Sequence, residues 1–320
     1  MRTLAAPASL KGVLSPPEAA AALARGLRSV AGVEAVELSI ADGGEGTADV
    51  VHAVLGGEWC ATEVADPLGR LVPARWLLLD DGTAVVESAA AIGLPLLDPG
   101  ERDPLRASSR GLGELLLAVL DERPSSLLVC LGGTATVDGG IGLREVVGDR
   151  LNGLPIRVAC DVRNPLLGER GAARAFGPQK GADAPAVEEL ERRLAALDEL
   201  APYRDVRGAG AGGGLGAAFA ALGAELAEGA ELVLDLVGFD DRARGAALVV
   251  TGEGTVDRTT FEGKAAGAVV RRCARRGIAC RLFGGVVADG LDAEPLSGRP
   301  ERAAEDLVLL GERLARLVFP

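Results

Sequence analysis

The sequence predicts an α/β protein made of two α/β domains, and three observations support this prediction. First, its 320 residues are about twice the roughly 150 residues of a typical single domain. Second, short apolar runs alternate with Ala- and Leu-rich windows of helical periodicity, which is typical of a mainly parallel sheet. Third, many of the 45 glycines stand in loops after apparent strands or before apparent helices. In an open α/β sheet such loops gather at the carboxyl ends of the strands, where ligands bind.

The N-terminal part of the chain predicts two strands with a helix between them. An apolar run over residues 4–6 indicates the first strand. Residues 16–30 are predicted as a helix, because Ser15 can act as its N-cap and Pro16 stands at its first position. A second strand is expected over residues 36–40, and it ends in the loop ADGGEGT.

The middle of the chain has a different pattern. Residues 58–87 alternate apolar and polar side chains and contain the turns DPLG and DDG, which is typical of antiparallel strands. Antiparallel strands inside a chain of alternating strands and helices indicate a second, inserted domain. The alternating pattern then resumes, with strands expected over 127–131, 247–251 and 279–283 and helices over 186–200 and 263–276.

Composition and charge exclude several functions. Hydrophobic residues make up 48% and charged residues 25%, the balance of a soluble globular protein. The net charge of −12 argues against nucleic-acid and acidic-membrane partners, since both require a basic surface. The five cysteines show no metal-binding spacing, no stretch approaches the ~18 apolar residues of a membrane span, and the first residues lack the apolar core of a signal peptide. We therefore expect a cytoplasmic protein.

The lysines are few and lie in similar surroundings. Of the 34 basic residues only Lys11, Lys180 and Lys264 are lysines, and each is next to a glycine. Codon bias in a GC-rich genome explains why arginine is common but not where the lysines remain. Arginine can replace lysine on a solvated surface but not in a tight site, where a compact ammonium fits. The three lysines are therefore candidate site residues.

Three glycine-rich segments could surround an anion: GGTATVDGG after a predicted strand, GAGAGGGLG before a predicted helix, and TGEGTVD after another strand. Glycine lets successive N–H groups converge on a phosphate, and a helix N-terminus adds partial positive charge. No Walker A loop is present, because Ala265 follows Lys264 and Arg258 stands in place of the first glycine. GAGAGGGLG matches the letters of a dinucleotide fingerprint, but the polar segment before it is no strand, so close packing is the competing explanation.

Acidic residues lie inside the same turns. Carboxylates at strand ends can bind Mg²⁺ or accept the proton of a substrate hydroxyl, although Asp and Asn also favour turns by themselves. Together with the lysines they indicate a site for a phosphorylated, Mg²⁺-bound ligand. The only histidine, His52, falls in a helical run with no nucleophile nearby, so we expect it to serve packing or to lie at the surface. The acidic and amide candidates are Asp42, Glu45, Asp138, Asp161, Asn164, Glu253 and Asp257.

Between residue 3 and about residue 287 the chain resembles the bacterial glycerate kinase family. The matching segments include APASLKG, ADGGEGTADV, DPLGR, ESAAAIGL, LGGTATVDGGIG, GAGAGGGLGAA and LVVTGEGTVDRTTFEGK. The segment ACDVRNPLLGERGAARAFGPQKGA is the most specific of them. All three lysines fall inside these segments.

The resemblance implies a flavodoxin-like parallel-sheet domain with a second mixed α/β domain inserted in it. We expect residues 1–45 and 245–320 to form the first domain and residues 46–244 the second. The resemblance also implies an ATP-dependent kinase that phosphorylates D-glycerate or a similar small hydroxy acid, with Mg²⁺ as cofactor. The expected partners are these small molecules, with no nucleic acid or membrane, and a homodimer remains open.

Residue types at the matched positions suggest roles. Lys11 would neutralise the substrate carboxylate or the transferring phosphoryl group, Asp42 would orient the substrate hydroxyl as a base, and Asp257 completes the expected catalytic set. Asp138 and Asp161 are the expected Mg²⁺ ligands. The expected contacts to substrate or nucleotide are Ser9, Gly43, Gly44, Glu45, Glu87, Gly132, Gly133, Thr134, Thr136, Asn164, Gln179, Lys180, Gly210, Gly212, Gly213, Glu253 and Lys264.

The chain departs from the family pattern and is shorter than its usual members. Ala8 replaces an aspartate, Val137 an asparagine, Thr255 an arginine and Thr259 a glutamine. If the missing aspartate is essential, the chain is a catalytically impaired relative that binds nucleotide or a small acid as a sensor or partner protein. A dinucleotide-dependent oxidoreductase is a third hypothesis, which rests on GAGAGGGLG alone.

Overall fold

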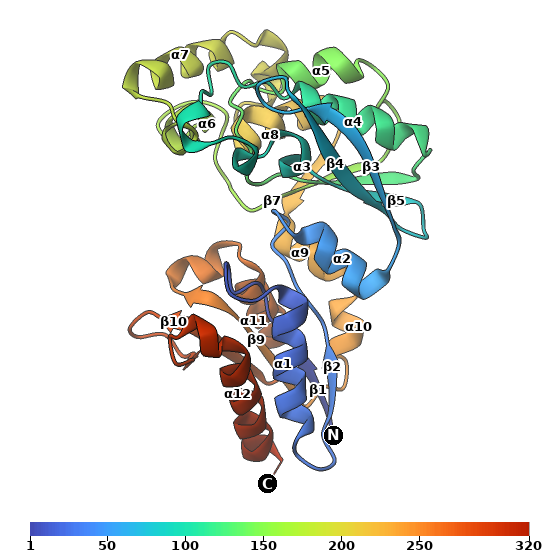
Figure 1. Ribbon diagram of the computed structural model, residues 1–320, viewed down its shortest axis with the longest axis vertical. Helices are drawn as coiled ribbons and strands as arrows, with labels where there is room; N and C mark the ends of the chain where they lie inside the picture. The colour runs from blue at the N-terminus through green and yellow to red at the C-terminus, as the bar shows by residue number, and fades with distance from the viewer. Residues whose placement is uncertain (320) are drawn as a thin grey trace. The chain divides into compact units, whose positions relative to one another are not determined.

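The computed structural model describes residues 1–319, which form two compact units (Figure 1). The first unit contains Met1–Asp42, Asp49–Leu55 and the chain from Ala230 onward. The second unit contains Gly43–Ala48 and Gly56–Gly229. The first unit thus includes residues 230–244, which the sequence-based boundary at residue 245 leaves in the inserted domain. No helix within residues 1–319 combines the length and the apolar character needed to span a membrane.

The first unit is built on a five-stranded sheet in which every neighbouring pair is parallel. Its strands are β1 (Arg2–Ala5), β2 (Glu34–Glu37), β9 (Leu248–Val256), β10 (Cys280–Val287) and β11 (Glu294–Pro295). They lie in the order β2-β1-β9-β10-β11, which is the flavodoxin-like arrangement of a doubly wound sheet. The predicted parallel-sheet domain is confirmed.

Helices cover both faces of this sheet, because successive strand residues point to opposite sides. Ala5 and Val250 pack with α1 (Pro16–Arg28) and α12 (Ala303–Val318), which lie side by side. Leu4 and Val249 pack on the other face with α9 (Gly229–Leu236), α10 (Phe239–Ala243) and α11 (Ala265–Arg276). The start of α1 is as predicted: Ser15 and Glu18 form a capping box, in which the Ser15 N–H donates to Glu18 Oε2 over 2.9 Å.

Two predicted bounds in this unit are corrected. The segment TGEGTVD was expected to be a loop, but strand β9 continues through it to Val256 and pairs with β10. Gly252 permits this pairing, because a Cβ built on it would lie 2.3 Å from the carbonyl oxygen of Phe283. The helix expected from residue 263 begins at Ala265, since Gly263 has a φ of +135°, which no helix contains.

The second unit contains a six-stranded mixed sheet in the order β3-β4-β5-β6-β7-β8. The predicted antiparallel segment forms β3 (Glu58–Ala65), β4 (Leu71–Leu78) and β5 (Thr83–Glu87). The remaining strands, β6 (Ser126–Cys130), β7 (Ile156–Cys160) and β8 (Glu225–Glu228), continue the sheet in parallel from β5. The predicted mixed α/β domain is therefore confirmed.

The helices of the second unit enclose two apolar cores. One core packs α4 (Arg110–Asp121), α5 (Ile141–Val147) and α8 (Ala211–Ala221) against the sheet, with α3 (Ser88–Ile92) beside them. The other core joins α6 (Ala172–Phe176) and α7 (Ala184–Ala195) to the loops around them. Helix α7 ends at Ala195 and not at residue 200 as predicted, because the chain turns at Leu197 into a 3₁₀ segment that contains Pro202. His52 lies in α2 (Thr47–Leu55), as expected for a helical run.

Candidate functional site

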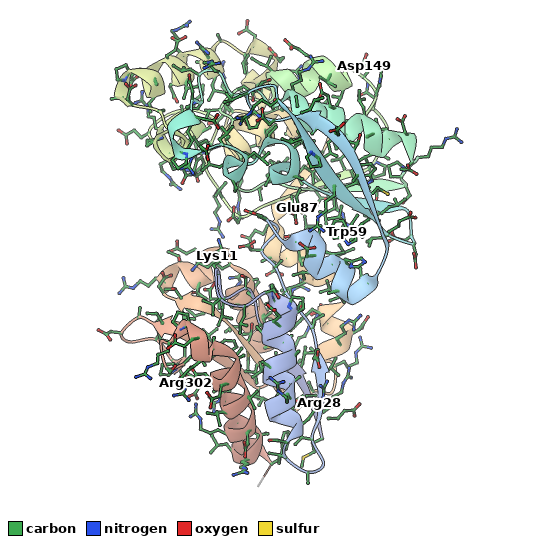
Figure 2. The ribbon with its side chains drawn as sticks, in the orientation of Figure 1. Lys11, Arg28, Trp59, Glu87, Asp149 and Arg302 are labelled. Carbon is green, nitrogen blue, oxygen red and sulfur yellow. The ribbon has the colours of Figure 1, made fainter. Side chains whose placement is uncertain are left out.

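In the first unit, the loops after β1 and β9 leave the sheet at its topological switch point. Strand β1 lies between β2 and β9, so the chain connections run to opposite sides there, and ligands bind in the crevice that such a point leaves. The N–H of Ala8 donates to the carbonyl oxygen of Gly252 over 2.9 Å. If Gly254 carried a Cβ atom, that atom would lie 3.6 Å from the backbone nitrogen of Lys11, so the two backbones are close to each other. Two segments that the sequence singled out separately are therefore neighbours, and Lys11 is exposed (Figure 2).

Four polar side chains gather at the end of β9. Glu253 Oε1 accepts hydrogen bonds from Thr260 Oγ1 over 2.6 Å and from Lys264 Nζ over 3.3 Å. The same Lys264 Nζ lies 3.8 Å from Asp257 Oδ1, so the ammonium stands between two carboxylates. The 3₁₀ segment η5 (Arg258–Glu262) carries Thr260 into this group. Three predicted site residues, Glu253, Asp257 and Lys264, are thus brought together.

The two carboxyl groups beside Lys264 differ in their acidity. Burial raises the pKa of Glu253, and the hydrogen bonds from Thr260 and Lys264 only partly offset this effect. The hydrogen bond from the Thr259 side chain lowers the pKa of Asp257, which lies at the surface. A carboxylate with a raised pKa accepts a proton more readily, so Glu253 has the better properties for a base.

Ala8 occupies the position at which the family pattern has an aspartate. Its side chain is buried in an apolar cluster with Ala6, Ile40 and Ala265. The backbone at this position keeps its hydrogen bond to β9, while the side chain adds no charge.

In the second unit, the carboxyl ends of three parallel strands bring predicted residues to one edge of the sheet. Glu87 is the last residue of β5, the loop beginning at Gly132 follows β6, and Asp161 follows β7. Because parallel strands end at the same side of a sheet, these positions lie along one edge. Figure 2 labels Glu87 at this edge.

The ADGGEGT segment packs on this edge and requires its glycines. Gly43 has a φ of +87°, and a Cβ built on it would lie 2.6 Å from the Cα of Gly229. A Cβ at Gly132 would lie 3.0 Å from the Cα of Gly44. At the end of the segment, the N–H of Ala48 donates to Glu87 Oε1 over 2.7 Å. Backbone therefore meets backbone with no room for side chains.

This packing places Glu45 beside the glycine loop that follows β6. Its Oε2 lies 3.4 Å from a Cβ built on Gly133, which has a φ of +63°. A pocket of about 440 Å³ opens next to it, a volume that accommodates a small-molecule ligand. The pocket is lined by Glu45, Ala48, Trp59, Ala61, Pro73, Ala74, Arg75, Glu87, Ala89 and Ala90.

Trp59 and Arg75 in this pocket were missed by sequence reasoning. The Arg75 guanidinium carbon lies 4.0 Å from the centroid of the Trp59 ring, which is cation–π geometry. Ala61 pairs with Arg75 across β3 and β4, so Trp59 and Arg75 are diagonal neighbours on one face of the hairpin. The signal that could have found them is this alternation along residues 58–78, once the register of the hairpin is known.

Lys180 lies in the interior of the second unit. Its Nζ donates hydrogen bonds to Thr134 Oγ1 over 3.0 Å and to the Thr136 carbonyl oxygen over 2.8 Å. Burial lowers the pKa of Lys180 to about 7, although the charge of Asp138 acts in the opposite direction. The neighbouring Gln179 is exposed.

Asp138, a predicted Mg²⁺ ligand, has both carboxylate oxygens engaged by protein groups. Its Oδ2 accepts from the Ser109 N–H over 2.8 Å and from Ser109 Oγ over 2.7 Å, and its Oδ1 accepts from the Gly140 N–H over 3.0 Å. It thereby joins the starts of α4 and α5. Asp161, the other predicted ligand, is exposed. Within residues 1–319 no three His, Cys, Asp or Glu side chains are grouped to bind a metal.

GAGAGGGLG is a packing element. Gly212, Gly213 and Gly214 have φ values of +61°, +76° and +98°. A Cβ on Gly213 would lie 2.0 Å from the carbonyl oxygen of Thr136, and a Cβ on Gly210 would lie 2.4 Å from that of Pro165. The segment before it is a 3₁₀ helix and not a strand, so a dinucleotide fingerprint lacks its structural context. Asn164 supports the same region, since its Nδ2 donates to the Arg170 carbonyl oxygen over 2.7 Å.

Comparison with known proteins gives one consistent result. The model of the "Glycerate kinase family" matches residues 3–153 and 144–299. Glycerate 2-kinase of Escherichia coli K12 is 39% identical over 303 residues, which cover 82% of this chain and 80% of that protein. Glycerate kinase of Bacillus subtilis is 38% identical, with 82% and 79% covered. A crystal structure assigned to glycerate kinase 2 of Salmonella typhimurium LT2 superposes with a TM-score of 0.89 at 34% identity, covering 99% of this chain and 98% of that one.

Proposed function

The chain belongs to the glycerate kinase family, and we propose on this basis that it transfers a phosphoryl group from ATP to glycerate, giving phosphoglycerate and ADP. Phosphoryl transfer needs positioned N–H groups and positive charge more than covalent chemistry. The observation that carries the proposal is the placement of the family segments. They lie at the switch point of the parallel sheet in the first unit and at the carboxyl edge of the sheet in the second.

In the first unit we assign the charge-handling roles to the residues around β9. Lys11 is exposed and next to Gly254, so it can neutralise the substrate carboxylate or the transferring phosphoryl group. Lys264 supplies a second positive charge, which Glu253 and Asp257 hold in place. The sequence predicts Asp42, the last residue of the first segment of this unit, as the base for the substrate hydroxyl. We propose Glu253 for this role instead, because burial raises its pKa.

In the second unit we propose that the loop beginning at Gly132 offers the N–H group of Gly133 to a phosphate, while the Gly132 N–H donates to Ser88 Oγ over 3.4 Å. Both positions favour glycine, because a Cβ at Gly132 would lie 3.0 Å from the Cα of Gly44 and Gly133 has a φ of +63°. Glu45 and Glu87 line the neighbouring pocket and can accept hydrogen bonds from hydroxyl groups of a ligand. Oriented N–H groups beside a pocket form an arrangement suited to a phosphorylated ligand.

We propose that Mg²⁺ enters bound to ATP, and we assign it no protein ligand. The bound Mg²⁺ ion would neutralise negative charge on the phosphates. Asp138 does not fit as a ligand, because its two oxygens accept hydrogen bonds from Ser109 and Gly140. Asp161 belongs to no group of three His, Cys, Asp or Glu side chains within residues 1–319 that could bind a metal.

A catalytically impaired sensor is not favoured, although Ala8, Val137, Thr255 and Thr259 motivate it. The curated relatives from E. coli and B. subtilis carry kinase names. We also propose a cytoplasmic location, which agrees with five cysteines that form no disulfide within residues 1–319. A homodimer stays a prediction.

The proposed function is tested by incubating the purified protein with ATP, MgCl₂ and D-glycerate and separating 2- and 3-phosphoglycerate by ³¹P NMR. We expect one phosphoglycerate to accumulate together with an equal amount of ADP. L-lactate, which lacks the second hydroxyl, is the control acid. Binding of ATP without any phosphoglycerate above background would refute the kinase assignment and favour the sensor.

A further inference from the structure

Lys180 alone among the three lysines is buried. It ends the 3₁₀ turn η3 (Pro178–Lys180), and only 4% of its surface is exposed. The next residue, Gly181, has a φ of +101°, and a Cβ built on it would lie 2.4 Å from the Arg102 carbonyl oxygen. The turn is therefore pressed against the backbone near Arg102, with the Lys180 side chain on the inside.

The Lys180 ammonium is held by the loop that follows β6. Its two acceptors are Thr134 Oγ1 at 3.0 Å and the Thr136 carbonyl oxygen at 2.8 Å. Thr134 is 4% exposed and Thr136 fully buried. A buried polar group that loses its hydrogen-bond partner destabilises the folded protein. Two of the three N–H groups of the Lys180 ammonium are thus used by this loop, and moving the ammonium toward a ligand would leave both acceptors without their donor.

Within residues 1–319, the Lys180 side chain makes no ion pair that could fix its position instead of this loop. The charged group that influences it is Asp138, which belongs to the same loop and is bound to Ser109 and Gly140. The Lys180 side chain therefore depends on this loop for both of its hydrogen bonds.

The Thr136 carbonyl is fixed from a second direction. Gly213 approaches it so closely that a Cβ would lie 2.0 Å from the oxygen, and the Gly139 N–H donates to the Gly213 carbonyl oxygen over 3.1 Å. Lys180 and Gly213 belong to two different segments of the family pattern. Both segments therefore converge on the loop that begins with Gly132 and Gly133.

We propose that Lys180 is a positioning residue: it fixes the loop of residues 132–136, so that Gly133 presents its N–H group to the phosphate, and it does not contact the ligand itself. The proposal rests on the proposed function and changes the expected role of Lys180 from a phosphate contact to a support. Its direct partner in this role is Thr134, whose side-chain hydroxyl can be removed without altering shape.

A double-mutant cycle tests the proposal. Lys180→Met and Thr134→Val each remove the hydrogen bond between the two side chains, and we expect each to lower kcat/KM for ATP by about 10- to 100-fold, since small displacements of positioning groups cost this much. The combined variant should lose no more than Lys180→Met alone, because both changes remove one interaction. Thr134→Ser keeps the hydroxyl and should recover most of the activity that Thr134→Val loses. If the two single losses multiply, Lys180 acts independently of Thr134 and the proposal is overturned.

Amide hydrogen exchange over residues 132–136, without any nucleotide, provides a readout that does not depend on activity. We expect faster exchange in Lys180→Met and Thr134→Val and wild-type exchange in Thr134→Ser. Unchanged exchange in both Thr134→Val and Lys180→Met, with kinetics impaired, would place Lys180 at the ligand and overturn the proposal. If the protein does not phosphorylate glycerate, the exchange result still stands, so failure of the proposed function is distinguishable. Thr134→Val carries the test if Lys180→Met fails to fold.

Discussion

The carbonyl oxygen of Thr136 occupies the space that a side chain at Gly213 would need, with 2.0 Å between the oxygen and the ideal Cβ position. Gly213 also has a φ of +76°, a conformation that costs other residues about 1–2 kcal/mol. The contact joins two glycine-rich segments that are far apart in the sequence. It explains why GAGAGGGLG needs a glycine here without any bound nucleotide.

Gly213→Ala should therefore lower the free energy of unfolding by roughly 2–5 kcal/mol, the sum of the backbone strain and the displacement of Thr136. Urea unfolding measures the effect. Gly223→Ala is the matched control, since Gly223 has a φ of +82° and no atom within 4 Å of its Cβ position. The control should lose only about 1–2 kcal/mol. Equal losses in the two variants would show that the contact with Thr136 does not constrain the loop.

Burial of Lys180 predicts a pH-dependent stability. Its pKa falls from 10.5, the ordinary value, to about 7 in the folded protein. Between these values the unfolded chain binds more protons than the folded chain, so the free energy of unfolding rises with pH. Below pH 7 Lys180 is protonated in both the folded and the unfolded chain, so the free-energy cost of burying its charge is fully present.

Urea unfolding of the wild type and Lys180→Met at pH 6, 8 and 9.5 measures this dependence. The difference in the free energy of unfolding between the wild type and the variant should be constant below pH 7. Above pH 7 this difference should rise by at most about 1.4 kcal/mol per pH unit. Other titrating groups cancel in the difference. A difference that stays constant over the whole range would show that the pKa of Lys180 is not lowered.

The sequence predicts the general architecture well, because the relevant signals are local. The capping box at Ser15 and the alternation over residues 58–87 depend on near neighbours, and both are observed. The family segments ADGGEGT and GGTATVDGG are also found at strand ends, as expected from the order of strands and loops.

What the sequence could not predict depends on contacts between distant segments. The extension of β9 to Val256 requires the partner strand β10, whose Phe283 fits against Gly252. The burial of Lys180 contradicts the usual exposure of lysine and arises only when Thr134 and Thr136 supply acceptors. The pocket containing Trp59 depends on the register of a hairpin, which residue types alone do not fix.

Glu253 should control the acid limb of the activity profile. Burial raises its pKa, so kcat/KM should fall as the pH drops through a value above that of an ordinary glutamate, when the carboxylate becomes protonated. Glu253→Gln should lower kcat/KM by about 10²–10⁴-fold, the usual contribution of a general acid or base, and abolish this limb. Asp257→Asn is the control, because the pKa of Asp257 is lowered and its removal should leave the limb in place. An unchanged limb in Glu253→Gln would exclude Glu253 as the titrating group.

Lys11 should contribute to catalysis and not to folding. It is exposed, so Lys11→Ala should leave the unfolding temperature within about 1–2 °C of the wild type, as is usual for surface substitutions. The loss of its positive charge near Gly254 should lower kcat/KM by about 10²–10³-fold, comparable to the loss of one transition-state hydrogen-bond donor. Lys11→Arg tests whether the shape of the charged group matters. A guanidinium is larger than an ammonium and planar, so we expect this variant to keep only part of the activity. Full activity in Lys11→Arg would show that charge alone is required, and near-normal kinetics in Lys11→Ala would remove Lys11 from the site.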